Sequence, residues 1–62
     1  MTVRDIRELW NSNKEVRIYQ DENDLFIGDL QDLEDDTYLD LIIDGIYDGI
    51  YENGNDIDIS VL

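Results

Sequence analysis

Carboxylates are the most abundant chemically active side chains of this chain, and they are unevenly distributed. The 62 residues include 17 Asp and Glu against four Lys and Arg, which gives a net charge of −13. All four cations lie within the first 17 positions, whereas residues 18–62 carry 14 acids and no cation. Because ordinary surfaces mix both signs, this run predicts a surface that repels itself and attracts a basic partner.

Carboxylates can also coordinate metals or catalyse hydrolysis, and the sequence argues against both. A calcium-binding EF-hand loop needs a fixed series of acids with a central Gly, which neither residues 21–32 nor residues 53–58 provide. The chain has no Cys and no His, the other common metal ligands and proton-transfer groups. A catalytic carboxylate pair needs a concave site, for which 62 residues leave little room. We therefore expect no enzyme activity, no cofactor and no dedicated metal site.

The N-terminal segment predicts an amphipathic helix over about residues 3–11. Thr2 and Asp5 have the spacing of a capping box. Apolar side chains then recur on one helical face, namely Val3, Ile6, Leu9 and Trp10. At such a position a Trp is more often a core residue than a binding residue.

Two apolar segments that flank a polar turn predict a β-hairpin. Residues 16–19 alternate in the strand period, and residues 25–27 are again apolar and end at Gly28. The alternation places Val16 and Ile18 together on one face of the first strand.

Residues 36–52 fit either a strand or a helix. As a helix they present an apolar stripe opposite acids at every fourth position, but Gly45 and Gly49 would each cost about 1 kcal/mol in its interior. As a strand they are rich in Ile and Tyr, and Asn53-Gly54 then signals a turn into the alternating residues 57–61. The strand is favoured, and a second helix over about 36–52 is the alternative.

A two-residue turn at positions 53–54 also predicts the register of this second hairpin. It places Ile46 opposite Val61, and Asp48 opposite Ile59 on the apolar face. A bulge near Gly49 would turn Asp48 outward.

These elements predict a single α+β domain over residues 1–62. One N-terminal helix packs on a small antiparallel sheet of about four strands, arranged as two hairpins. The acidic connection between the hairpins contains Leu30 and Leu33, which fit either one helical turn or an irregular loop packed down by these leucines.

Binding to a basic protein is the function that the charge run predicts best. The first hypothesis is an inhibitor that mimics DNA or RNA and occupies the Lys/Arg groove of a nucleic-acid-binding protein. The predicted partner-binding residues are Asp32, Glu34, Asp35, Asp36, Asp40, Asp44, Asp48, Tyr47 and Tyr51. The alternative is an acidic adaptor or antitoxin-like subunit that binds a basic surface unrelated to nucleic acid.

Other partners follow from the same composition. The chain has no basic patch for direct nucleic-acid binding. No apolar run reaches the roughly 18 residues that cross a membrane, and no signal segment is evident, so we expect a cytoplasmic protein and no membrane partner. The sequence leaves open whether the chain forms a homodimer.

The layout of residues 2–9, 16–19 and 56–61 resembles the short open reading frames of bacteriophages and mobile elements. Its size and acidity are similar to those of phage-encoded inhibitors such as anti-CRISPR and anti-restriction proteins, several of which mimic DNA. This resemblance implies a defence nuclease of a bacterial host as the target, but it transfers no binding residue, because such inhibitors share a charge distribution rather than a motif. The Arg-bearing first helix departs from it, and implies that this end faces away from the basic groove or contacts something else.

Self-repulsion yields a testable expectation about stability. Added salt should raise the melting temperature by screening the negative charges from one another, and mild acid should do so by neutralising part of them. Thermal unfolding followed by circular dichroism at low and moderate salt measures this effect. A melting temperature that stays flat or falls with salt would contradict the expectation.

Overall fold

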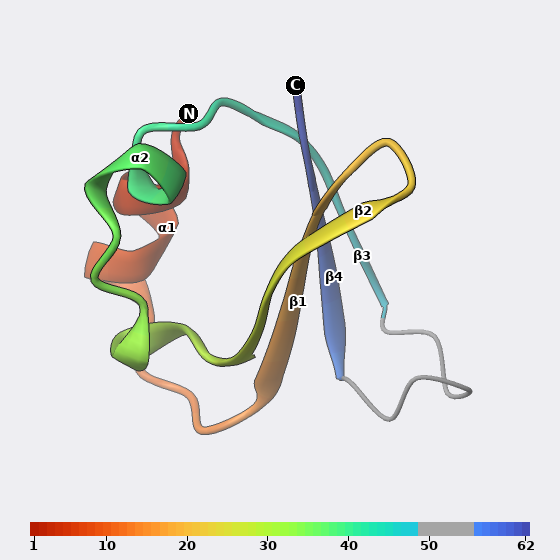
Figure 1. The fold of residues 1–62 in the computed structure, drawn as a ribbon. Coiled ribbons are helices and arrows are strands. Elements are labelled where there is room, and N and C mark those ends of the chain that lie inside the picture. The colour runs from red at the N-terminus through yellow and green to blue at the C-terminus, as the bar shows by residue number, and fades with distance from the viewer. Residues whose placement is uncertain (49–55) are drawn as a thin grey trace.

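The computed structural model describes residues 1–48 and 56–62, in which a group of short helices packs against one face of a sheet (Figure 1). The helical elements are α1 (Val3–Leu9), the 3-10 turn η1 (Leu30–Asp32) and α2 (Asp36–Leu39). The strands are β1 (Glu15–Gln20), β2 (Asn23–Asp29), β3 (Ile43–Asp48) and β4 (Ile57–Val61). The predicted α+β fold, with its N-terminal helix and four strands, is confirmed.

The first helix begins at the predicted capping box. The Asp5 N–H donates to the Thr2 hydroxyl at 3.4 Å, and the Thr2 N–H donates to the Asp5 carboxylate at 2.9 Å. The Gln31 side-chain amide donates to the carbonyls of Arg7 and Trp10 at the other end of α1. The Arg7 carbonyl also accepts the Trp10 N–H, so the two Gln31 bonds serve mainly to tie the end of α1 to η1.

The sheet is mixed rather than antiparallel throughout, which corrects the predicted arrangement. Its strand order is β2-β1-β4-β3, and the two hairpins, β1–β2 and β3–β4, are antiparallel as expected. The central pair β1–β4 is parallel, with Ile18 opposite Ile59. The cause is the connection after β2: it climbs along the helical layer and crosses the top of the molecule, so that β3 starts at the top and β4 returns in the direction of β1 (Figure 1).

Residues 36–52 split between the two predicted alternatives. Residues 36–39 form the short helix α2, and residues 43–48 form the strand β3. The alternative prediction of one long helix is therefore wrong for residues 43–48. Isoleucine and tyrosine favour the strand, and pairing with β4 supplies the backbone hydrogen bonds that a helix would otherwise provide.

The register of the second hairpin also differs from the prediction. Ile46 lies opposite Ile59 rather than Val61, and Asp48 lies opposite Ile57. The predicted turn at 53–54 and the predicted bulge at Gly49 lie outside the described residues.

A bulge is found earlier in the strand, at Asp44. The register shifts between Ile43 and Gly45, which leaves Asp44 as the extra residue with its side chain exposed. The Tyr47 ring lies against Gly45, where a methyl group would collide with the ring and its hydroxyl. A glycine at this position therefore gives the tyrosine its place on the sheet.

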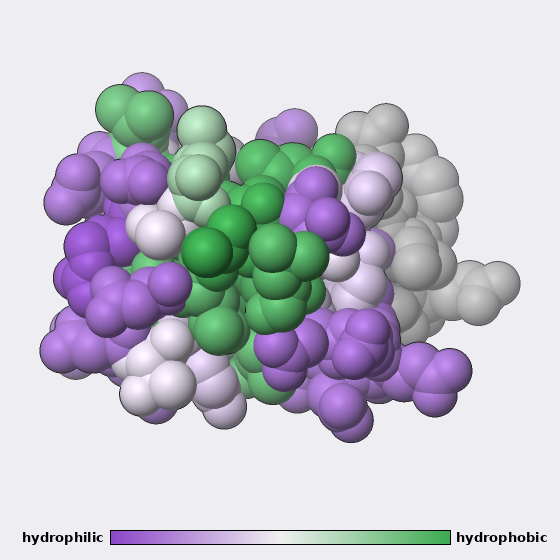
Figure 2. Space-filling model, turned by 90° about the horizontal axis from the view of Figure 1, so that it is seen from above, coloured by the Kyte–Doolittle hydropathy of each residue, from purple (hydrophilic) through white to green (hydrophobic). Residues whose placement is uncertain are grey.

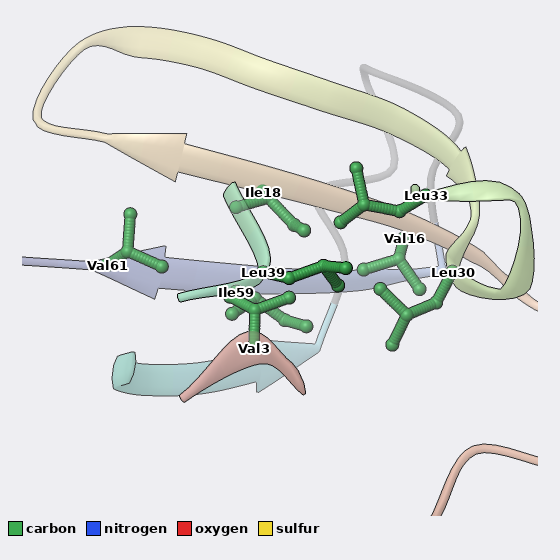
Figure 3. Close-up of a cluster of buried hydrophobic side chains, with 8 residues drawn as sticks. All are labelled: Val3, Val16, Ile18, Leu30, Leu33, Leu39, Ile59 and Val61. Carbon is green, nitrogen blue, oxygen red and sulfur yellow. The ribbon is translucent and has the colours of Figure 1, made fainter. Parts of the chain in front are cut away.

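The core lies between the sheet and the helical layer (Figure 3). Val16 and Ile18 both point into it, which confirms the predicted face of β1. The segment between the hairpins adds Leu30 and Leu33 to the core, and of the two predicted alternatives it forms a helical turn, the 3-10 turn η1. Among the described residues, the buried apolar cluster consists of Val3, Val16, Ile18, Leu30, Leu33, Leu39, Ile59 and Val61.

Ile59 and its cross-strand neighbour Ile46 provide a matched test of this core. Ile59 is fully buried and Ile46 is 49% exposed. We expect Ile59→Ala to lower the free energy of unfolding by about 2–5 kcal/mol, a large part of a small domain's stability, because it leaves a cavity. Ile46→Ala should cost much less, and urea denaturation measures both. Equal losses would contradict the assignment of β4 to the core.

Candidate functional site

Five of the nine predicted binding residues lie on one stretch of the helical layer. We call these residues the acidic strip: Asp32, Glu34, Asp35, Asp36 and Asp40, all exposed. The buried leucines of the same stretch, Leu30, Leu33 and Leu39, hold it on the sheet. With the leucines facing inward, the carboxylates are left in water on the outside, where a partner can reach them.

Two acids of this stretch also have structural tasks. The Asp29 carboxylate accepts the Gln31 N–H at 3.0 Å at the start of η1, and Asp35 accepts the Thr37 N–H at 2.9 Å at the start of α2. A carboxylate at such a position satisfies a free N–H and faces the positive end of the helix dipole. Asp35 therefore belongs to the fold as well as to the strip.

Arg4 of α1 contacts the strip directly. Its guanidinium donates to the Asp36 carboxylate at 3.1 Å and to the Asp40 carboxylate at 3.0 Å. These hydrogen bonds raise the pKa of Arg4, and the bond to Asp36 has the larger effect. The side chains are 39% exposed for Arg4, 81% for Asp36 and 68% for Asp40, so these are surface ion pairs. The cation-bearing helix therefore lies beside the predicted binding acids.

Asp5 is a structural acid at the start of α1. Its pKa is lowered, mainly because the carboxylate accepts the Thr2 backbone N–H. A pKa below the unfolded value means that the ionised Asp5 stabilises the fold at pH values above the ordinary pKa of aspartate. This contribution is lost as the pH falls through the folded pKa.

A second charged cluster lies on the sheet face opposite the core. The Arg17 guanidinium donates to Asp24 at 2.7 Å and to Asp58 at 3.4 Å, and it sits 4.3 Å from the centre of the Tyr19 ring. The side chains of Arg17 and Asp58 are only 13% and 3% exposed. Asp58 thus belongs to the acidic run of the sequence but lies buried beside a cation, which makes it a structural residue.

The remaining predicted residues belong to the second hairpin. Asp44 is exposed at the bulge of β3, and Tyr47 is 55% exposed on the sheet face that carries Arg17. Asp48 ends β3, but its side chain and the whole of Tyr51 lie outside the described residues. The structure therefore separates the predicted residues into the acidic strip on the helical layer and a smaller group on β3.

The roles of Arg4 and Arg17 are not evident from the sequence, because all their partners except Asp24 are distant in the chain. Arg4 contacts acids 32 and 36 positions away, and Arg17 contacts Asp58 across 41 positions. One local signal was available for Arg17: a cation between two buried strand residues must point to the opposite face of the sheet.

Three further observations bear on function. Among residues 1–48 and 56–62, no group of three or more acids is arranged to hold a metal ion. In the same part of the chain, no helix is both long and apolar enough to span a membrane. Comparisons with known protein families, curated proteins and solved structures gave no match. The charge, exposure and contacts of the side chains are therefore the features that bear on function.

The two arginine clusters predict losses of stability that differ in size when each arginine is replaced by alanine. Arg17→Ala removes a cation beside the buried Asp58 and should lower the free energy of unfolding by about 3 kcal/mol. Arg4→Ala is the matched control, because Arg4 also contacts two aspartates but in water, and its effect should be small. Urea denaturation of both variants measures the difference. Equal stability of the two variants would show that the Arg17 cluster has no special role.

Proposed function

We propose that this protein is an acidic inhibitor that mimics nucleic acid and blocks the basic groove of a bacterial nucleic-acid-binding protein, such as a defence nuclease. It would act in the cytoplasm of the host cell and contact a protein rather than nucleic acid itself. The observation that carries the proposal is the exposed acidic strip, which presents five carboxylates along residues 32–40.

The contacts of Arg4 support this proposal. One guanidinium already lies between Asp36 and Asp40 at 3.0–3.1 Å. The spacing of these carboxylates therefore suits an arginine side chain, the group that nucleic-acid-binding grooves use most to contact phosphates. A groove whose Lys and Arg side chains neutralise DNA phosphates also attracts a row of carboxylates through its positive potential.

The separation of the predicted residues favours a second candidate. The acidic strip lies on the helical layer, whereas Tyr47 lies opposite Asp58 on the other face of the sheet, so the predicted residues do not form one continuous row like a strand of phosphates. An acidic adaptor or antitoxin-like subunit needs no such row, because it only has to match a basic surface. Competition with nucleic acid distinguishes the two candidates.

The test begins with a pull-down from bacterial lysate at low and high salt, which supplies the target. Binding of the purified target is then measured with increasing concentrations of duplex DNA. A mimic must be displaced by the duplex. If this protein and duplex DNA bind the target together with undiminished affinity, the mimic is contradicted and the adaptor remains as the candidate.

Charge reversal at Asp32 and Glu34 tests the strip itself. Both side chains are exposed, and no helix cap or ion pair is described for them. We expect Asp32→Lys with Glu34→Lys to weaken target binding on the order of tenfold or more, and to reduce its salt dependence. Glu8→Lys with Glu22→Lys changes the net charge equally on exposed residues of α1 and of the β1–β2 turn. Equal weakening by both pairs would show that only net charge matters.

A further inference from the structure

Three large apolar side chains lie exposed where the chain ends meet the segment before β3. Met1 is 68% exposed, Ile42 52% and Leu62 66%. The Ile43 N–H donates to the Met1 carbonyl at 2.8 Å, and the Leu62 N–H donates to the Ile42 carbonyl at 2.9 Å. We call Met1, Ile42 and Leu62 the apolar patch. Figure 2 looks onto this end of the molecule and shows a continuous apolar area there.

The core does not explain this patch. None of its three residues belongs to the buried cluster or to the partly buried side chains described as packing against it. A strongly acidic chain has ample polar side chains for its surface, so adjacent exposed apolar groups indicate a contact surface.

Three acids lie near the apolar patch, and one of them, Asp40, is paired with Arg4. Asp40 and Asp44 lie two positions on either side of Ile42, and Asp5 accepts the N–H of Thr2, which forms a bridge with Ile42. All three acids are exposed. In Figure 2 hydrophilic side chains border the apolar area on both sides. An apolar centre with a charged rim is the general anatomy of a protein interface.

The rim determines the kind of occupant. A second copy of this chain would bring the same acids against one another, with a net charge of −13 on each copy. A basic partner would instead pair its cations with the rim while an apolar group covers the centre.

We propose that the apolar patch binds a basic amphipathic segment of a partner protein, in which apolar side chains are flanked by Lys or Arg. This inference rests on the proposed function, because Asp40 and Asp44 are among its binding residues. It deepens that function by adding a contact that nucleic acid itself cannot make, and such a contact keeps the inhibitor bound where salt screens the charges.

The probe is a synthetic peptide with leucines on one helical face and lysines on the other, compared with a scrambled peptide of the same composition. Calorimetry of the full chain should show at least tenfold tighter binding of the amphipathic peptide. Ile42→Ser should abolish that difference. Ile27→Ser is the matched control, because Ile27 is 51% exposed and lies on β2, at the edge of the sheet opposite to β3. Circular dichroism confirms that both variants fold.

Two results would overturn the proposal. The first is equal affinity of the protein for the two peptides, or an equal loss of affinity for the amphipathic peptide in the two variants. Either result would show that the apolar patch is not used. The second is self-association at high salt that Ile42→Ser abolishes, measured by sedimentation without peptide, which would assign the patch to a second copy. Competition by duplex DNA is a separate experiment, so failure of the mimic and failure of the apolar patch are distinguishable.

Discussion

In the part of the chain that the structure describes, eight buried apolar side chains have to hold together a protein with a net charge of −13. The central strands β1 and β4 supply four of them, including Ile18 and Ile59 as direct neighbours in a parallel pair. The helical layer supplies the other four, which cover a single face of this pair. Every carboxylate must then find water, a cation or a backbone N–H, because a buried charge without partners is costly.

The acids divide into two groups under this constraint. Asp29 and Asp35 are the N-caps of η1 and α2, Asp5 completes the capping box that Thr2 begins at α1, and Asp58 lies buried beside Arg17. Part of the acidity of this chain therefore serves the fold, because these aspartates satisfy backbone N–H groups at the starts of helical elements. The other acids, above all those of the acidic strip, are the ones that the proposed partner would contact.

The proposed interaction combines two kinds of force that act over different ranges. Carboxylates along residues 32–40 attract a basic surface from a distance and favour fast association. The apolar patch acts only at contact and is insensitive to salt. Because Asp40 belongs to the acidic strip and lies two residues from Ile42, the two surfaces meet at one end of the molecule. A nucleic-acid mimic with an apolar anchor would thereby gain selectivity for one groove among many basic ones.

Local residues determined the first helix and the first hairpin, because a capping box and an alternating strand depend only on near neighbours in sequence. They also determined that the leucines of the connection face inward and its acids outward. Tertiary structure alone decided the parallel pairing of β1 with β4, the shifted register at Ile46, and the contact of Arg17 with Asp58 across 41 positions. The physical reason is that alternation states which face of a strand is apolar but not which distant strand lies beside it. That choice depends on the path of the whole connection over the core. The same path decides that Arg4 lies against the acidic strip.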